Sequence, residues 1–181
     1  MTASMGASVA IAWLILRVVA GTILAAHGVQ KLFGWFDGPG VAKWEQGLRA
    51  QGFKPVRFWT GLSIIGEVGG GLALALGFLT PLGAAGAFGA MLMALVKVHW
   101  KNGFFNGKRG IEFPLALMAM GTAVGLAGPG TISLDNLFGI VFPYPQLFIV
   151  LAIIALLVDI VGLVITRPSS VATAASRAQA S

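Results

Sequence analysis

Long apolar segments alternate with short polar ones along most of the chain. A helix needs about 20 mostly apolar residues to cross the hydrocarbon core of a bilayer. The segments with this length and composition are residues 9–34, 56–79, 81–100, 111–128 and 146–166. The pattern therefore predicts an all-α fold, a polytopic bundle of membrane helices, with residues 1–8 as a short N-terminal tail.

A further helix is predicted between the first two membrane segments, at residues 39–52. Trp44 and Leu48 fall on one face of this segment at helical spacing, whereas the charged side chains lie elsewhere. Glu45 and Arg49 have the i,i+4 spacing of a favourable ion pair. The segment is therefore expected to be a short amphipathic helix that lies at the membrane interface.

The composition is that of a membrane protein. Of the 181 residues, 57% are hydrophobic and 10% are charged, and the mean hydropathy is +0.88, whereas about a quarter of the residues of a soluble domain are charged. The formal net charge is +6. No basic cluster with interleaved aromatic residues stands apart from the apolar segments, so nucleic acid is not expected as a partner. Cysteine is absent, which excludes disulfides, Cys-ligated zinc and iron–sulfur clusters.

Basic residues occur in alternate connections between the predicted membrane helices. None lies between the second and third helices or between the fourth and fifth. The other connections and the C-terminal region carry Lys43, Arg49, Lys54 and Arg57; Lys101, Lys108 and Arg109; and Arg167 and Arg177. Because short cytoplasmic loops are enriched in Lys and Arg, we expect the N-terminus outside and the C-terminus inside. Residues 167–181 are expected to form a disordered cytoplasmic tail.

The first membrane segment carries three basic side chains on one stripe. At about 100° per residue, Arg17, Lys31 and His27 lie within roughly 80° of one another, and Gly21 and Gly28 border them. Glycines let helices approach closely in a membrane, and ionisable groups there usually face the bundle interior. This stripe is therefore expected to face the other helices.

Glu67, in the second segment, is the expected acidic partner of this stripe. The heights of these residues along their helices indicate that Glu67 contacts His27 from one side and Arg17 from the other. Arg17 would be the permanent cation and His27 the titratable group. Lys31 and Lys97 are expected to extend to the membrane surface. Further ionisable residues of the membrane segments are His99, Glu112 and Asp159.

Several interpretations of these charges remain open. They form a structural network that fixes helix register, or they line a polar pocket for a quinone or quinol headgroup or a proton relay, or they dock another subunit. A bis-histidine haem between His27 and His99 is disfavoured, because the chain has only 2 histidines and no pattern of haem-propionate ligands. No metal-ligand set is recognisable. Asp159 is expected to make an inward polar contact or to pair with a basic group.

Several motifs occur together in a specific order: RVVAGTILAAHGVQKLFGWF, Glu67 before GGGLALALGFLTPLGA, His99, and IEFPLALMAMGTAVGLAGPGTISLD. In this order and spacing they resemble the DoxX family of small bacterial membrane proteins, from about Arg17 to Asp135. The resemblance implies that residues of this chain correspond to the family's recurrent polar positions and to a loop motif of the family. The polar positions are Arg17, His27, Gly28, Lys31, Glu67, His99, Glu112 and Asp135, and the loop motif is Gly128, Gly130 and Asp135.

The resemblance implies a four-helix membrane core over residues 9–142, to which the helix at residues 146–166 is added. It also implies a multi-pass protein of the bacterial inner membrane that contacts the lipid bilayer. Members of the family are associated with quinone-linked redox complexes and with redox stress. The chain is therefore expected to be a subunit or accessory factor of a membrane oxidoreductase and not an independent enzyme, with the cofactor left open and quinone or quinol as the candidate.

Two other functions are left open by the same residues. One is a scaffolding membrane protein without chemistry of its own, and the other is a transporter of a small solute or protons. The chain shows no clear inverted repeat and no matching pair of Pro-broken helices, which disfavours the transporter. Expected partners are other redox subunits of the membrane, and formation of a homo-oligomer is left open.

Overall fold

The computed structural model describes residues 2–166 and is helical without strands over that range, which confirms the predicted fold class. The predicted tail at residues 167–181 lies outside the described residues. The α-helices are α1 (Thr2–Phe33), α2 (Gly40–Ala50), α3 (Val56–Ile64), α4 (Gly70–Leu76), α5 (Thr80–Ala94), α6 (Glu112–Ala127), α7 (Leu134–Leu137) and α8 (Gln146–Ile165).

Short helical turns of other types extend these helices. The π-helical turn η1 (Ile65–Gly69) joins α3 to α4, and the π-helical turn η2 (Leu95–His99) continues α5. The 3₁₀ turns η3 (Trp100–Asn102) and η4 (Asn106–Lys108) lie in the connection to α6. Because a π turn bonds each residue one position further along than an α-helix does, η1 and η2 change which side chains face the neighbouring helices.

Within residues 2–166, four helical stretches are long and apolar enough to cross a bilayer: Gly6–Phe33, Val56–Leu76, Thr80–Asn102 and Gln146–Ile165. The remaining predicted segment is α6, which has 16 residues and is therefore about 24 Å long, shorter than predicted. α6 nevertheless connects opposite ends of the bundle. Before α6, the nitrogen of Glu112 bonds to the carbonyl of Phe104, and after it the nitrogen of Asp135 bonds to the carbonyl of Gly77 at the end of α4.

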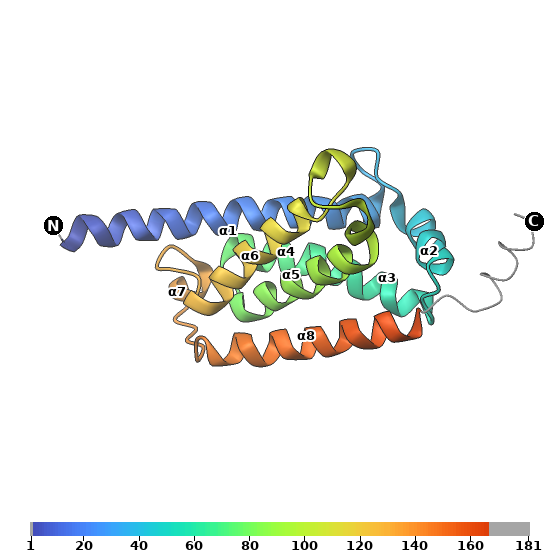
Figure 1. Ribbon diagram of the computed structural model, residues 1–181. Coiled ribbons are helices and arrows are strands. Elements are labelled where there is room, and N and C mark those ends of the chain that lie inside the picture. Colours follow the sequence, from blue (N-terminus) through green and yellow to red (C-terminus); the bar gives the residue numbers. More distant parts are fainter. Residues whose placement is uncertain (1, 167–181) are drawn as a thin grey trace, which may run out of the picture.

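The first helix begins earlier than its hydropathy indicates. The chain is already helical at Thr2, so most of the tail predicted at residues 1–8 belongs to α1. Hydropathy alone located the start of the apolar stretch at residue 9, whereas helical hydrogen bonding continues through the small and polar residues before it. Figure 1 shows this part of α1 extending beyond the other helices.

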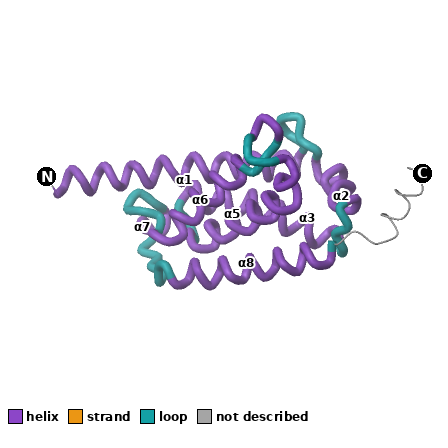
Figure 2. Tube along the Cα trace, in the orientation of Figure 1, coloured by secondary structure: helices purple, strands orange, loops and turns teal. Residues whose placement is uncertain are grey.

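α5 lies at the centre of the bundle (Figure 1). It packs against α4, α6 and α8, while α1 packs against α4 and α6. α2 lies at one end of the bundle and α7 at the other, with most of the loops at these two ends (Figure 2). We refer to these as the α2 end and the α7 end. The added helix α8 is therefore attached to the other helices mainly along α5.

Glycines set the closest helix contacts. A Cβ atom on Gly71 of α4 would lie 2.5 Å from the backbone nitrogen of Ala25 in α1, and one on Gly21 of α1 would collide with the backbone of Ala75. A Cβ atom on Gly83 of α5 would lie 2.9 Å from the backbone of α4. The predicted close approach of helices at small residues is confirmed.

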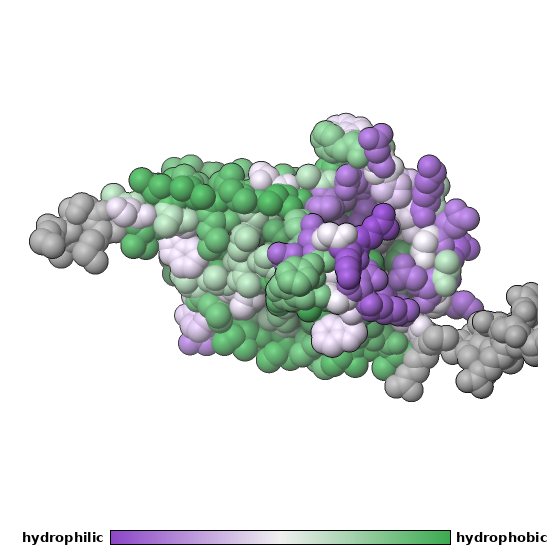
Figure 3. Space-filling view, turned by 45° about the horizontal axis from the view of Figure 1, so that its top comes forward, coloured by the Kyte–Doolittle hydropathy of each residue, from purple (hydrophilic) through white to green (hydrophobic). Residues whose placement is uncertain are grey.

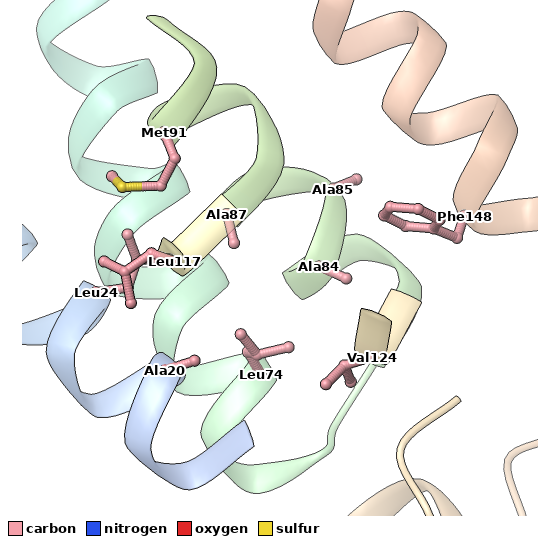
Figure 4. Packing of buried hydrophobic residues seen from close by; sticks show 10 residues of the cluster. All are labelled: Ala20, Leu24, Leu74, Ala84, Ala85, Ala87, Met91, Leu117, Val124 and Phe148. Atoms are coloured by element: carbon pink, nitrogen blue, oxygen red, sulfur yellow. The ribbon is translucent and has the colours of Figure 1, made fainter. Parts of the chain in front are cut away.

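The buried core lies between α1, α4, α5 and α6, with a contribution from α8 (Figure 4). Leu24, Leu74 and Val124 are fully buried there, and Phe148 of α8 packs at the edge of the core beside Gly125. Figure 3 shows hydrophobic residues along the flank of the bundle and hydrophilic residues gathered toward the α2 end. The flank is therefore suited to contact with lipid.

α2 covers one end of the bundle, as its amphipathic pattern predicts. Leu48 is buried in a cluster with Phe53 and Trp59. Glu45 and Arg49 form the predicted ion pair, with 3.9 Å between the charged atoms. α2 is more than an interfacial helix, because its apolar side packs into the bundle and completes the hydrophobic interior.

Candidate functional site

A cavity of about 380 Å³ extends from the α2 end to Leu82 near the start of α5. Its floor is a face of α5 made of small residues, Gly86, Gly89 and Ala90. α3 and η1 form one wall, α8 forms the other, and α2 and Phe53 close one end. Most of the lining is apolar, as is typical of sites for ligands with a large hydrocarbon part.

The charged residues of the cavity are few. Lys31 of α1 and Glu67 of η1 form an ion pair in which the side chains are 16% and 3% exposed. The Lys31 ammonium also lies 4.1 Å from the centre of the Trp44 ring, which is a cation–π contact. The expectation that Lys31 extends to the membrane surface is therefore wrong, because a buried carboxylate and an aromatic face hold its ammonium inside the bundle.

Glu67 has a second carboxylate oxygen that does not join this ion pair. Oε1 contacts Lys31, whereas Oε2 is buried and has no hydrogen-bond partner among residues 2–166. Burying a polar atom without a partner costs free energy. Glu67 also lies in the π turn η1, and π turns are frequent at functional sites. Glu67 therefore lines the cavity with one carboxylate oxygen paired and the other buried without a partner among the described residues.

Trp44 connects α2 to this wall. Its Nε1 donates a hydrogen bond to Ser63 Oγ at 2.9 Å, and the Ser63 hydroxyl donates to the carbonyl of Thr60 at 3.0 Å. The same indole ring contacts the ammonium of Lys31. Trp44 thus links α1, α2 and α3 beside the ion pair and fixes the position of the Lys31 side chain.

Arg17 does not pair with Glu67, contrary to the expectation from the sequence. Its guanidinium donates hydrogen bonds to the carbonyl of Ala75, at 3.2 Å, and to the carbonyl of Ile132. Its charge interacts with that of Asp135. Arg17 is 2% exposed, so the inward orientation is confirmed. Its partners lie at the α7 end because the backbone carbonyls in the last turn of α4 and in the loop before α7 are within reach there.

Asp135 organises the α7 end. Its carboxylate accepts hydrogen bonds from the nitrogens of Leu79 and Thr80, at 2.8 and 3.0 Å, and from the Thr80 hydroxyl at 2.6 Å. These contacts satisfy donors at the start of α5. Gly128 and Gly130 have φ angles of 88° and 80°, which glycine adopts readily. The loop motif therefore turns the chain from α6 toward α7 and attaches α7 to α5.

Tyr144 lies in the connection between α7 and α8, close to Asp135. Burial raises the pKa of the Tyr144 phenol to about 12, and the Asp135 carboxylate acts in the same direction. Burial and the Asp135 carboxylate therefore both disfavour a negative charge on this phenol.

His27 lies on the flank of the bundle. Its ring centre is 5.2 Å from that of Phe113 in α6, and its side chain is exposed. The expectation that His27 faces fully inward is corrected, because the next residue, Gly28, takes the inward position and lies directly against Glu67 and Val68. His27 is still close enough to Glu67 for their charges to interact.

His99 and Glu112 belong to the loop between η2 and α6. His99 Nδ1 lies 2.7 Å from the carbonyl oxygen of Arg109, and Glu112 Oε2 accepts a hydrogen bond from the nitrogen of Asn106 at 2.8 Å. Neither residue lines the cavity of the described chain. The candidate residues are thus divided between the Lys31–Glu67 pair with nearby His27, this loop, and the α7 end.

Asp159 of α8 lines the cavity but was not among the site residues predicted from the sequence. It is 6% exposed, and within the part of the chain that the structure describes its Oδ2 atom has no hydrogen-bond partner. Lys97 does not pair with Asp159; its ammonium donates hydrogen bonds to the carbonyl of Thr166 at 3.2 Å and to the Thr166 hydroxyl at 2.6 Å. The sequence feature that could have indicated Asp159 as a site residue is a single carboxyl group in a highly apolar segment.

Four helices of membrane-spanning length, apolar flanks and an interior cavity define a polytopic membrane protein in contact with the lipid bilayer. The DoxX family model matches residues 12–100, which supports membership of the DoxX family. The matched region begins at residue 12, within α1, and ends just after η2, whereas α6, α7 and α8 follow it. Comparisons with curated proteins and with solved structures gave no match.

Proposed function

We propose that the protein is a subunit of a quinone-linked membrane oxidoreductase and that its cavity binds the quinone or quinol. The observation that supports this proposal is a mostly apolar cavity lined by Glu67, whose buried Oε2 atom has no hydrogen-bond partner among the described residues. Quinones and quinols combine an apolar tail with a ring that carries two oxygen atoms. Sites for such ligands are apolar with a few well-placed polar groups.

Each residue near the ion pair has a proposed role. Glu67 accepts a hydrogen bond from a quinol hydroxyl through Oε2, while Lys31 holds Oε1 and fixes the carboxylate. His27, exposed on the flank of the bundle near Glu67, passes protons between this carboxylate and the surroundings, because an imidazole can accept a proton at one ring nitrogen and donate one from the other. Electrons are exchanged with another redox subunit, so the chain acts as part of a complex.

We further propose that the α2 end faces the cytoplasm and that the protein lies in the bacterial inner membrane. Exposed Lys and Arg residues support this orientation, because such residues concentrate in cytoplasmic loops. At the α2 end and in the loop before α6 they are Lys43, Arg49, Lys54, Arg57, Lys101, Lys108 and Arg109.

Mass spectrometry of the gently solubilised complex tests the proposed function. We expect a quinone or quinol and other redox subunits to copurify with the wild-type chain. Glu67→Gln is expected to lower the amount of bound quinone at least about tenfold, because one charge-assisted hydrogen bond is lost. The associated chains should remain. Glu45→Gln, which alters a carboxylate of the surface pair in α2, is the control and should leave the bound quinone unchanged.

A scaffolding role predicts a different result in the same experiment. The wild-type protein would then copurify with other chains but without a quinone, and Glu67→Gln would alter only its abundance. That outcome would contradict the proposed function. His27→Ala supplies a further readout, because it is expected to keep the quinone bound while it slows quinol oxidation by the complex.

A further inference from the structure

A second carboxyl group faces the cavity from the wall opposite Glu67. Asp159 of α8 is 6% exposed and lines the cavity. Gly89 of α5 packs closely against α8 at this point, since a Cβ atom on this glycine would lie 3.1 Å from the Cβ of Ala155 and at an ordinary contact distance, 3.9 Å, from Asp159 Oδ2. The walls formed by η1 and α8 therefore each contribute one acidic residue to the lining of the same cavity.

The carboxyl group of Asp159 has no structural role that the described contacts reveal. The ion pairs of residues 2–166 are Lys31–Glu67 and Glu45–Arg49, and Lys97 is bound to Thr166. An apolar side chain of similar size would avoid the cost of burying a carboxyl group without a partner. A ligand with a hydrogen-bonding group would remove this cost.

The cavity opens toward the flank of the bundle that is suited to lipid. Leu62 of α3, Leu82 of α5 and Ile154 of α8 line it and are nevertheless 39%, 50% and 50% exposed. These residues therefore lie at its mouth. A ligand dissolved in the bilayer can enter there with its tail among leucine and isoleucine side chains, while its polar ring reaches deeper between the walls.

We propose that Asp159 is a second binding residue, and that the ligand is a dihydroxy aromatic ring held by Glu67 through one hydroxyl and by Asp159 through the other. This inference rests on the proposed quinol-binding function. It also assigns a role to α8, which lies beyond the residues that match the DoxX model. The ring is bound only where α8 completes the cavity, so α8 sets the specificity of the site.

Calorimetric titration of the full chain in detergent micelles with decylubiquinol, under anaerobic conditions, tests the role of Asp159. The wild type is expected to bind the quinol about tenfold more tightly than its monomethyl ether, which lacks one hydroxyl donor. Asp159→Asn is expected to weaken quinol binding about tenfold and to abolish this discrimination. Asp159→Leu replaces the buried polar group by a hydrophobic side chain, keeps the fold, and should give the same loss.

The other variants make the outcomes distinct. If Glu67→Gln weakens quinol binding but Asp159→Asn and Asp159→Leu bind like the wild type, the inference about Asp159 fails and the proposed function stands. Ala90→Leu fills the cavity floor without removing a polar group and is expected to abolish binding. If none of these variants changes the titration, the quinol only partitions into the micelle, and both proposals fail.

Discussion

Replacement of Lys31 by Met is expected to lower the free energy of unfolding by about 3–5 kcal/mol. The substitution keeps most of the aliphatic stem but removes the ammonium, so the Glu67 carboxylate, with a side chain only 3% exposed, loses its cation. A buried charge without compensation is strongly destabilising. Reversible unfolding in mixed detergent micelles, followed by circular dichroism, measures the change.

Two matched variants separate this effect from a general loss of packing. Arg49→Met breaks the ion pair with Glu45 on α2, in which the Arg49 side chain is 64% exposed, and is expected to cost about 1 kcal/mol or less. Adding Glu67→Leu to Lys31→Met removes both buried charges and should restore most of the stability. Equal losses for Lys31→Met and Arg49→Met would show that the Lys31–Glu67 pair is not buried.

Asp135→Asn is expected to destabilise the fold by about 3 kcal/mol, because a buried acceptor of charge-assisted hydrogen bonds is replaced by a neutral amide. The Asp135 carboxylate is 1% exposed and accepts bonds from two backbone nitrogens and one hydroxyl at the start of α5. An amide has one acceptor oxygen and directs N–H donors at the other site. Faster hydrogen exchange at the Leu79 and Thr80 amides would accompany the lower unfolding midpoint.

Asp37→Asn is the matched control for this prediction. Asp37 is exposed in the loop between α1 and α2 and has a φ angle of 59°, which Asn tolerates well. The same chemical change is therefore expected to alter stability by about 0.5 kcal/mol or less. A loss for Asp135→Asn no larger than that for Asp37→Asn would contradict the role of Asp135 in joining α7 to α5.

Helix positions follow from the sequence because length and hydropathy largely determine which segments enter a bilayer. α8 agrees with its predicted range, residues 146–166, to within one residue. Close packing at Gly21 and Gly71 also follows from residue size. α6 likewise agrees with its predicted range, residues 111–128, to within one residue at each end.

The polar contacts were predicted less well than the helices. A helical wheel gives the direction of Arg17 and Lys31 from α1 but not the neighbour that each long side chain reaches. Arg17 reaches carbonyls at the α7 end, and Lys31 reaches Glu67. The π turn η1 adds to the difficulty, because positions calculated at about 100° per residue assume a regular α-helix.

The role of α8 depends on information that the sequence pattern lacks. Asp159 is visible as a carboxyl group in an apolar segment, but the pattern does not show that α8 packs on α5 beside Gly89. Glu67 and Asp159 are far apart in the chain, and only the packing of α3–η1 and α8 on α5 places both at one cavity. Tertiary packing, not local composition, assembles the proposed site.

Binding of a quinone between η1, α5 and α8 is tested most directly by photolabelling the detergent-solubilised protein with an azido-quinone and mapping the labelled peptides. We expect saturable labelling of peptides that contain Trp59, Ala90 or Met93, which line the cavity. Unlabelled decylubiquinol should displace the label, and Ala90→Leu should prevent it. Labelling that does not saturate, or that is equally strong at exposed Ile153 and Val161 on α8, would contradict a quinone site in this cavity.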